Sequence, residues 1–98
     1  MSVRDTSKEA YIDGYLSGGF SKQEIKIIKY LLDRYPETRN EIAEGTNLAI
    51  NAVSGRVNTL IKKGALREVG KKECRISSRI NHSVTIDDWL KKRLHKQS

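Results

Sequence analysis

The segment from residue 50 to residue 63 carries a stripe of amide, hydroxyl and basic side chains opposite its apolar residues. At helical spacing, the inward positions are Val53, Val57, Leu60 and Ile61. The outward positions are Asn51, Ser54, Gly55, Asn58 and Lys62, flanked by Arg56 and Thr59. Asparagine can bond the N6 and N7 edge of adenine, and arginine the O6 and N7 edge of guanine. The stripe therefore indicates a helix that reads the major groove of duplex DNA, with a plain solvated face as the alternative, and the predicted base contacts are Asn51, Ser54, Gly55, Arg56 and Asn58.

Positive charge is concentrated in the second part of the chain. The 98 residues include 19 Lys and Arg against 12 Asp and Glu, a net charge of +7. Residues 1–60 are neutral, whereas residues 61–98 contain eleven basic and four acidic side chains. Excess lysine can serve solubility alone, but this asymmetry favours a basic surface that meets a polyanion. The predicted contacts with the DNA backbone are Arg39, Asn40, Thr59, Lys62, Lys63, Arg67, Lys71, Lys72, Arg75 and Arg79.

The first two thirds of the chain have the pattern of helices. They are expected at residues 6–17, 21–35 and 38–63, the last interrupted by a turn. Ser21 and Thr38 are each followed three residues later by a glutamate, which is the spacing of a capping box. Tyr35 is expected on the apolar face of the second helix, which ends there because Pro36 follows.

The apolar period changes after Gly64, a residue that suits a left-handed helix cap. Short strands are expected at residues 66–69, 74–76 and 84–86, with a turn at residues 70–72 and a polar loop at residues 77–83. A last helix is expected at residues 87–95. The predicted fold class is mainly α with a small β-hairpin wing (residues 66–86), in one domain over residues 1–98.

Residues 38–66 have the pattern of two helices joined by a tight turn. Ala43 is small enough for the two helix axes to approach, and Asn47 tolerates the positive φ that the turn requires. Leu48 then fills the corner between the helices. This is a helix-turn-helix pattern, and the following glycine cap and hairpin make it the winged variety.

These residues resemble the winged helix-turn-helix superfamily in the style of MarR-like regulators and, more narrowly, small phage and prophage DNA-binding proteins. The segments that carry the resemblance are Thr38–Ala43, Val53–Asn58 and Lys63-Gly64, with Thr6–Tyr11 and the wing around Cys74 supporting the narrower likeness. The match covers residues 6–86. The departures are Asn47 in the turn and Ser77-Ser78, where a threonine-glycine pair is expected in the wing.

The resemblance implies a regulator of transcription whose partner is double-stranded DNA. MarR-like proteins dimerise through terminal helices, so a homodimer would use Thr6–Leu16 and Asp87–Leu94. Trp89, in the last helix, either folds back onto its own chain or is buried in a partner.

The sequence contains no set of residues suited to catalysis or metal binding. Cys74, His82 and His95 are the only cysteine and histidines, and their spacing matches no metal site. No glycine-rich phosphate loop is present. We therefore predict no enzyme, no metal and no cofactor. The single cysteine, with neither a signal-peptide stretch nor a membrane span, favours a cytoplasmic protein in a bacterial or phage-infected host cell.

Two other functions remain open on the sequence alone. A winged helix can serve as a protein-interaction module, here as an inhibitor of a host factor. It can also act as an architectural factor that bends DNA in recombination or replication.

Overall fold

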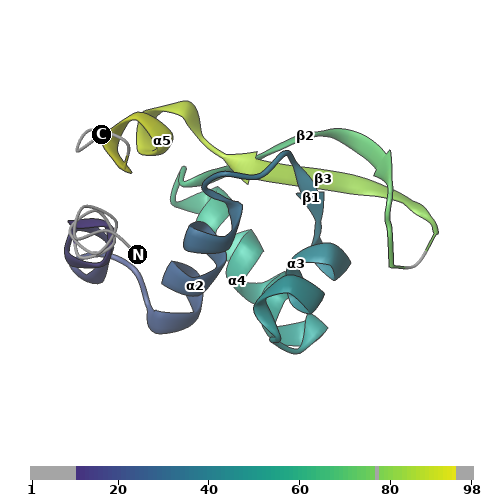
Figure 1. The fold of residues 1–98 in the computed structure, drawn as a ribbon, viewed down its shortest axis with the longest axis horizontal. Coiled ribbons are helices and arrows are strands. Elements are labelled where there is room, and N and C mark those ends of the chain that lie inside the picture. The colour runs from purple at the N-terminus through teal and green to yellow at the C-terminus, as the bar shows by residue number, and fades with distance from the viewer. Residues whose placement is uncertain (1–10, 77, 95–98) are drawn as a thin grey trace, which may run out of the picture.

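A computed structural model describes residues 11–76 and 78–94 of the chain. Residues 11–17 are helical, and the elements after them are α2 (Lys22–Leu31), β1 (Glu37–Thr38), α3 (Arg39–Thr46), α4 (Ile50–Lys62), β2 (Leu66–Glu73), β3 (Ile80–Ile86) and α5 (Asp88–Leu94). The strands form an antiparallel sheet in the order β1-β3-β2. Helices α2, α3 and α4 pack together below this sheet, and the β2–β3 hairpin, the wing, projects beyond them (Figure 1). The predicted fold class, mainly α with a β-hairpin wing, is confirmed.

One apolar core joins the two ends of the described chain. Ile12 and Leu16 from the first helical segment belong to the same buried cluster as Leu90 and Leu94 of α5. The hydroxyl of Tyr11 donates a hydrogen bond to a backbone oxygen of α5 at 3.2 Å. The apolar faces of both terminal helices are therefore covered within their own chain. The expected residues 6–10 and 95 of these helices lie outside the described residues.

Trp89 folds back onto its own subunit, which was one of the two alternatives for this side chain. Its indole N–H donates to the backbone oxygen of Gly64 at 2.7 Å. The ring itself remains 45% exposed. α5 is thereby fastened to the turn that follows α4.

Both predicted capping boxes are present, and each places a glutamate carboxylate on backbone N–H groups. Glu24 Oε1 accepts from the N–H of Ser21 at 2.9 Å, and Glu41 Oε1 accepts from the N–H of Thr38 at 3.0 Å. In return, the serine and threonine hydroxyls accept from the glutamate N–H groups. These caps fix where α2 and α3 begin.

The two residues expected in left-handed conformations adopt them. Asn47 ends α3 with φ 60°, and its N–H bonds to carbonyl groups of the last turn. Gly64, which follows the C-cap residue Lys63 of α4, has φ 80°. These two turns set the direction of α4 relative to α3 and to the wing.

Gly45 on α3 lies directly against the Tyr30 side chain of α2, a contact that the sequence did not indicate. A side chain at residue 45 would occupy the space of the Tyr30 ring. That ring is held in place, because its hydroxyl donates to Glu37 at 2.7 Å and the Arg34 guanidinium stacks on it at 4.1 Å. A glycine is therefore required where these two helices meet.

The second helix is shorter than predicted. α2 ends at Leu31, and Tyr35, expected on its buried face, is 91% exposed. The chain already turns at Leu32 and Asp33, before the steric effect of Pro36 on Tyr35 can act. After Pro36 the chain forms β1, which was not predicted and pairs with β3.

The wing has longer strands and a later turn than predicted. Residues 70–72 lie inside β2, where Val69 forms a β-bulge and Gly70 has φ 143°, so the expected turn there is wrong. A lone glycine in a strand signals a bulge as readily as a turn. The chain reverses at residues 74–79, which removes the expected strand at 74–76. Ser78 adopts φ 59° in this turn, the conformation for which a glycine is expected.

We expect Gly45→Ala to destabilise the protein by about 1–2 kcal/mol, because the new methyl group must displace the Tyr30 ring and break its bond to Glu37. Gly55→Ala is the matched control. The space beside Gly55 is open, and alanine favours a helix by up to about 1 kcal/mol over glycine. In urea unfolding, the two variants should shift the midpoint in opposite directions. A Gly45→Ala protein as stable as the native chain would contradict the proposed packing.

Candidate nucleic-acid interface

The outward face of α4 carries the polar stripe that the sequence indicates. Val53, Val57 and Leu60 are buried against the core. The exposed positions of the stripe are Asn51, Gly55, Asn58 and Lys62, with Ser54 and Thr59 half-buried beside them. No atom of another part of the chain lies within 4 Å of a side chain built at Gly55. The helix thus presents an exposed polar surface, and the residue at its centre, Gly55, has no side chain.

Arg56 lies on a different flank of α4. Its Nε donates to the side chain of Gln23 on α2 at 3.1 Å. Thr59 also bonds inward, since its hydroxyl donates to the backbone oxygen of Gly55 at 3.0 Å. Among the predicted base contacts, Asn51, Ser54, Gly55 and Asn58 lie together, and Arg56 is directed toward α2.

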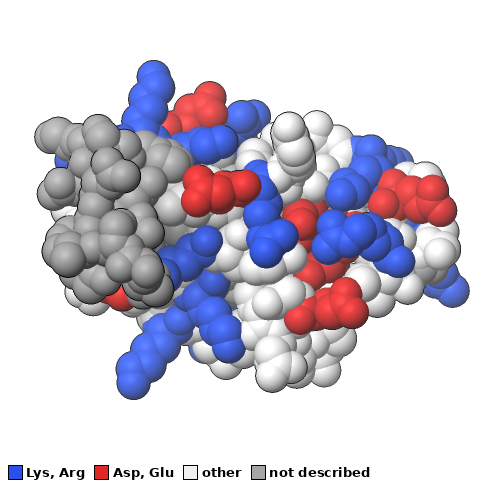
Figure 2. All heavy atoms as spheres, viewed as in Figure 1, with Lys and Arg blue, Asp and Glu red and all other residues white. Residues whose placement is uncertain are grey.

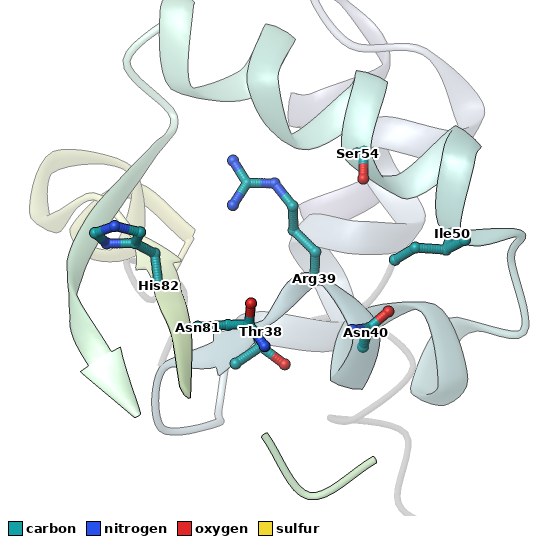
Figure 3. Close-up of a pocket in the computed structure, with 7 residues that line it drawn as sticks. All are labelled: Thr38, Arg39, Asn40, Ile50, Ser54, Asn81 and His82. Atoms are coloured by element: carbon teal, nitrogen blue, oxygen red, sulfur yellow. The ribbon is translucent and has the colours of Figure 1, made fainter. Parts of the chain in front are cut away.

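A hollow of about 260 Å³ separates α4 from the wing. The residues that line it are Thr38, Arg39, Asn40, Ile50, Ser54, Asn81 and His82. In Figure 3 the Arg39 side chain extends through the middle of this hollow, between the strand that carries His82 and the helix that carries Ser54. The start of α3, the start of α4 and the wing therefore meet at one place.

Ile50, Asn81 and His82 line the hollow although the sequence did not indicate them as site residues. His82 was expected in a loop, but it lies in β3. The sequence did contain a signal for the longer strand, because the every-second-residue spacing of Val84 and Ile86 extends back through residue 82 to Ile80. Ile50 lies at the first turn of α4 and is 40% exposed.

Arg39 connects three elements around the hollow. Its Nη2 donates to Asn58 Oδ1 at 2.9 Å, and its Nη1 lies 3.6 Å from Glu68 Oε2. The side chain is 25% exposed. α3, α4 and β2 are therefore joined through one guanidinium group.

The wing turn is held to the start of α3 by the carboxylate of Glu41, which is fully buried. Its Oε2 accepts from the N–H of Arg75 at 2.8 Å, and its Oε1 lies 3.2 Å from the Lys72 ammonium. The Arg75 guanidinium lies 3.4 Å from Glu37, a second buried carboxylate. The hydroxyl of Thr38 lies 3.0 Å from the buried sulfur of Cys74. Lys72 and Arg75, predicted to contact DNA, are thus partners of buried acidic groups.

The surroundings of the buried glutamates shift their titration. Burial alone would raise the pKa of Glu41, but two backbone N–H groups and the Lys72 ammonium outweigh it and hold the pKa below 4.5. The pKa of Glu24 is lowered in the same way, with burial opposed by the Ser21 N–H and by Lys63. Both carboxylates are therefore stabilised in the charged form.

The other residues predicted to contact the DNA backbone differ in their surroundings. The Lys63 ammonium is 3.0 Å from Glu24 and lies over the Phe20 ring, and Arg67 is 3.5 Å from Asp88. Lys62, Lys71 and Arg79 are exposed. On the face drawn in Figure 2, acidic side chains lie between the basic ones, so the charge is mixed and no continuous basic surface covers this side.

Two further features bear on the classes of function. Over residues 11–76 and 78–94, no three His, Cys, Asp or Glu side chains are grouped so that they could hold a metal ion. Within the same ranges, no helix has the length and apolar character needed to cross a membrane.

Comparison with known proteins identifies the fold. Residues 20–67 match the family described as winged helix-turn-helix DNA-binding. The search of curated proteins found no match. Among solved structures, the chain is similar to a probable transcriptional regulator from Pseudomonas aeruginosa, with a TM-score of 0.65 and 15% sequence identity. This similarity covers 93% of the present chain and 66% of that protein. The resemblance to the winged helix-turn-helix superfamily is confirmed.

We expect stability to fall as the pH is lowered below 4.5, the ordinary pKa of a glutamate. The pKa values of Glu24 and Glu41 are lower in the folded chain, so the unfolded chain takes up protons first and is favoured at acid pH. Above 4.5 the stabilisation is fully present. Thermal unfolding between about pH 6 and pH 3 would measure this loss.

Glu41→Gln separates the contribution of the wing contact. It should lower the free energy of unfolding by about 2–3 kcal/mol at neutral pH, because charge-assisted bonds to a buried carboxylate are lost. It should also flatten the acid part of the profile. Glu44→Gln, on the exposed side of the same helix, is the control and should change stability by less than about 0.5 kcal/mol. An unchanged acid profile in Glu41→Gln would contradict this role.

Proposed function

Since the chain carries a winged helix-turn-helix DNA-binding domain at residues 20–67, we propose that it is a sequence-specific regulator of transcription. In this proposal α4 enters the major groove and the wing contacts the flanking DNA backbone. The bases are read by Asn51, Ser54 and Asn58, whose side chains present hydrogen-bonding groups of the kinds that distinguish base pairs.

The observation that carries the proposal is the uncovered polar face of α4 with Gly55 at its centre. A glycine inside a helix costs about 1 kcal/mol relative to alanine. No packing within the chain requires it, because the space beside it is open. A residue without a side chain lets another molecule approach the helix closely, as the wall of a DNA groove would.

The contacts with phosphate are proposed to come from a smaller set than the basic residues of the sequence. Lys62 at the end of α4 and Lys71 on β2 are exposed cations, and Arg79 in the wing turn is exposed but also takes part in an interaction within the chain. Asn40 borders the hollow between α4 and the wing, whereas Arg39, which also lines it, is already bonded to Asn58 and Glu68. Lys63, Lys72 and Arg75 remain candidates only if their internal ion pairs open, which costs stability. Arg56 would likewise have to leave Gln23 to reach a base.

Dimerisation and a phage or prophage origin are narrower proposals. The phage origin rests on the likeness of Thr6–Tyr11 and of the wing to small phage proteins. Dimerisation rests on the resemblance to MarR-like regulators, which pair through terminal helices. The inner faces of the terminal helices are buried within the chain, so a dimer would use their outer surfaces, where Trp89 is partly exposed.

We expect DNA affinity to fall with salt at a log–log slope near −3, for about three to four phosphate contacts. Lys62→Gln and Lys71→Gln should each make the slope shallower by about 1. Lys92→Gln is the matched control, because this exposed lysine lies on α5, at the end of the molecule away from the wing (Figure 1). Fluorescence anisotropy with labelled duplex at several salt concentrations measures the slope. A slope near zero would rule out this interface and favour a protein partner.

A further inference from the structure

The hydrogen bond between Arg39 and Asn58 decides which atoms of Asn58 are available to a ligand. Nη2 of Arg39 lies 2.9 Å from Oδ1 of Asn58. A guanidinium group has only donors, so the amide must turn its oxygen toward Arg39. The NH2 group of Asn58 therefore points away from Arg39, on the exposed face of α4.

Arg39 is itself held in the position that makes this bond. Glu68 of β2 lies 3.6 Å from its other terminal nitrogen, on the wing side of the hollow. The arginine side chain is 25% exposed, whereas Asn58 is exposed at the surface of the stripe. The amide plane is thus held by an arginine that is itself held from the wing side.

We infer that Asn58 acts as a donor only, and that it selects guanine in the base pair that it faces. Guanine presents two adjacent acceptors, N7 and O6, in the major groove, and the NH2 group of Asn58 can donate to both, whereas adenine N7 or thymine O4 offers it a single acceptor. The bidentate pairing of asparagine with adenine also needs the amide oxygen, to accept from adenine N6. That oxygen is turned toward Arg39. Cytosine presents a donor at this edge and is disfavoured for the same reason.

This inference assigns a specificity-determining role to Asn58 and a positioning role to Arg39, and it rests on the proposed function. It also revises the expectation, drawn from residue types alone, that an asparagine on α4 would read adenine. It also explains why Glu68 places a negative charge close to the DNA face, since Glu68 holds Arg39 in place.

The test is selection of binding sites from random duplex DNA by the native chain and by three variants. Asn58→Ala identifies the base position that Asn58 reads, as the position where the preference is lost. In the native chain that position should be guanine. Arg39→Met keeps the aliphatic stem but frees the amide oxygen, so the ratio of adenine to guanine at that position should rise about tenfold or more. Glu68→Gln removes the charge but keeps an oxygen that can accept from Arg39, so guanine should stay preferred.

The outcomes separate the inference from the proposed function. A merely structural or phosphate-binding role of Arg39 would weaken binding to all sequences equally and leave the preferred base unchanged. Adenine at this position in the native chain, or the same preference in Arg39→Met as in the native chain, would overturn the inference. Failure of the native chain to enrich any sequence would instead overturn the proposed function.

Discussion

The carboxylate of Glu41 is fully buried where α3, β1 and the wing turn meet, and a buried charge must be paired or hydrogen-bonded. One oxygen caps α3 through the N–H of Thr38, and the other accepts from the N–H of Arg75 in the wing turn. Lys72 supplies the opposite charge. Because each of these partners comes from a different element, none can move without leaving the charge uncompensated. Glu41 therefore ties the wing turn and β2 to the start of α3.

The same device occurs at the start of α2, where Glu24 closes a capping box and pairs with Lys63 at the end of α4. In both places the glutamate that caps a helix also forms an ion pair with a lysine far away in the sequence. This use of cations explains why the 19 lysines and arginines of the sequence overstate the basic surface. Several of them neutralise carboxylates inside the fold. In the proposed function, a smaller group at the end of α4 and on the wing contacts the DNA.

The parts of the fold that could be predicted from the sequence are those set by neighbouring residues. The capping boxes at Ser21 and Thr38, the positive φ of Asn47 and the cap at Gly64 each follow from a few adjacent positions. The wing turn could not be placed, because a glycine in a strand serves a bulge as well as a turn. The polar stripe of α4 was visible in the spacing of residues. Its chemistry was not, since the bond from Arg39 to Asn58 joins residues 19 positions apart.

The hydrogen bonds that the side chains of this surface make in the free protein affect how it can recognise a ligand. Arg39 spans α3, α4 and β2, so the hollow between helix and wing has its width fixed in the free protein. A surface ordered in advance loses less conformational entropy on binding, which favours affinity from few contacts. The same ordering limits which bases can be bound, because an amide whose oxygen is held by Arg39 cannot turn over to pair with adenine instead of guanine. Rigidity and specificity at this interface thus have one physical origin, the guanidinium of Arg39 lodged between Asn58 and Glu68.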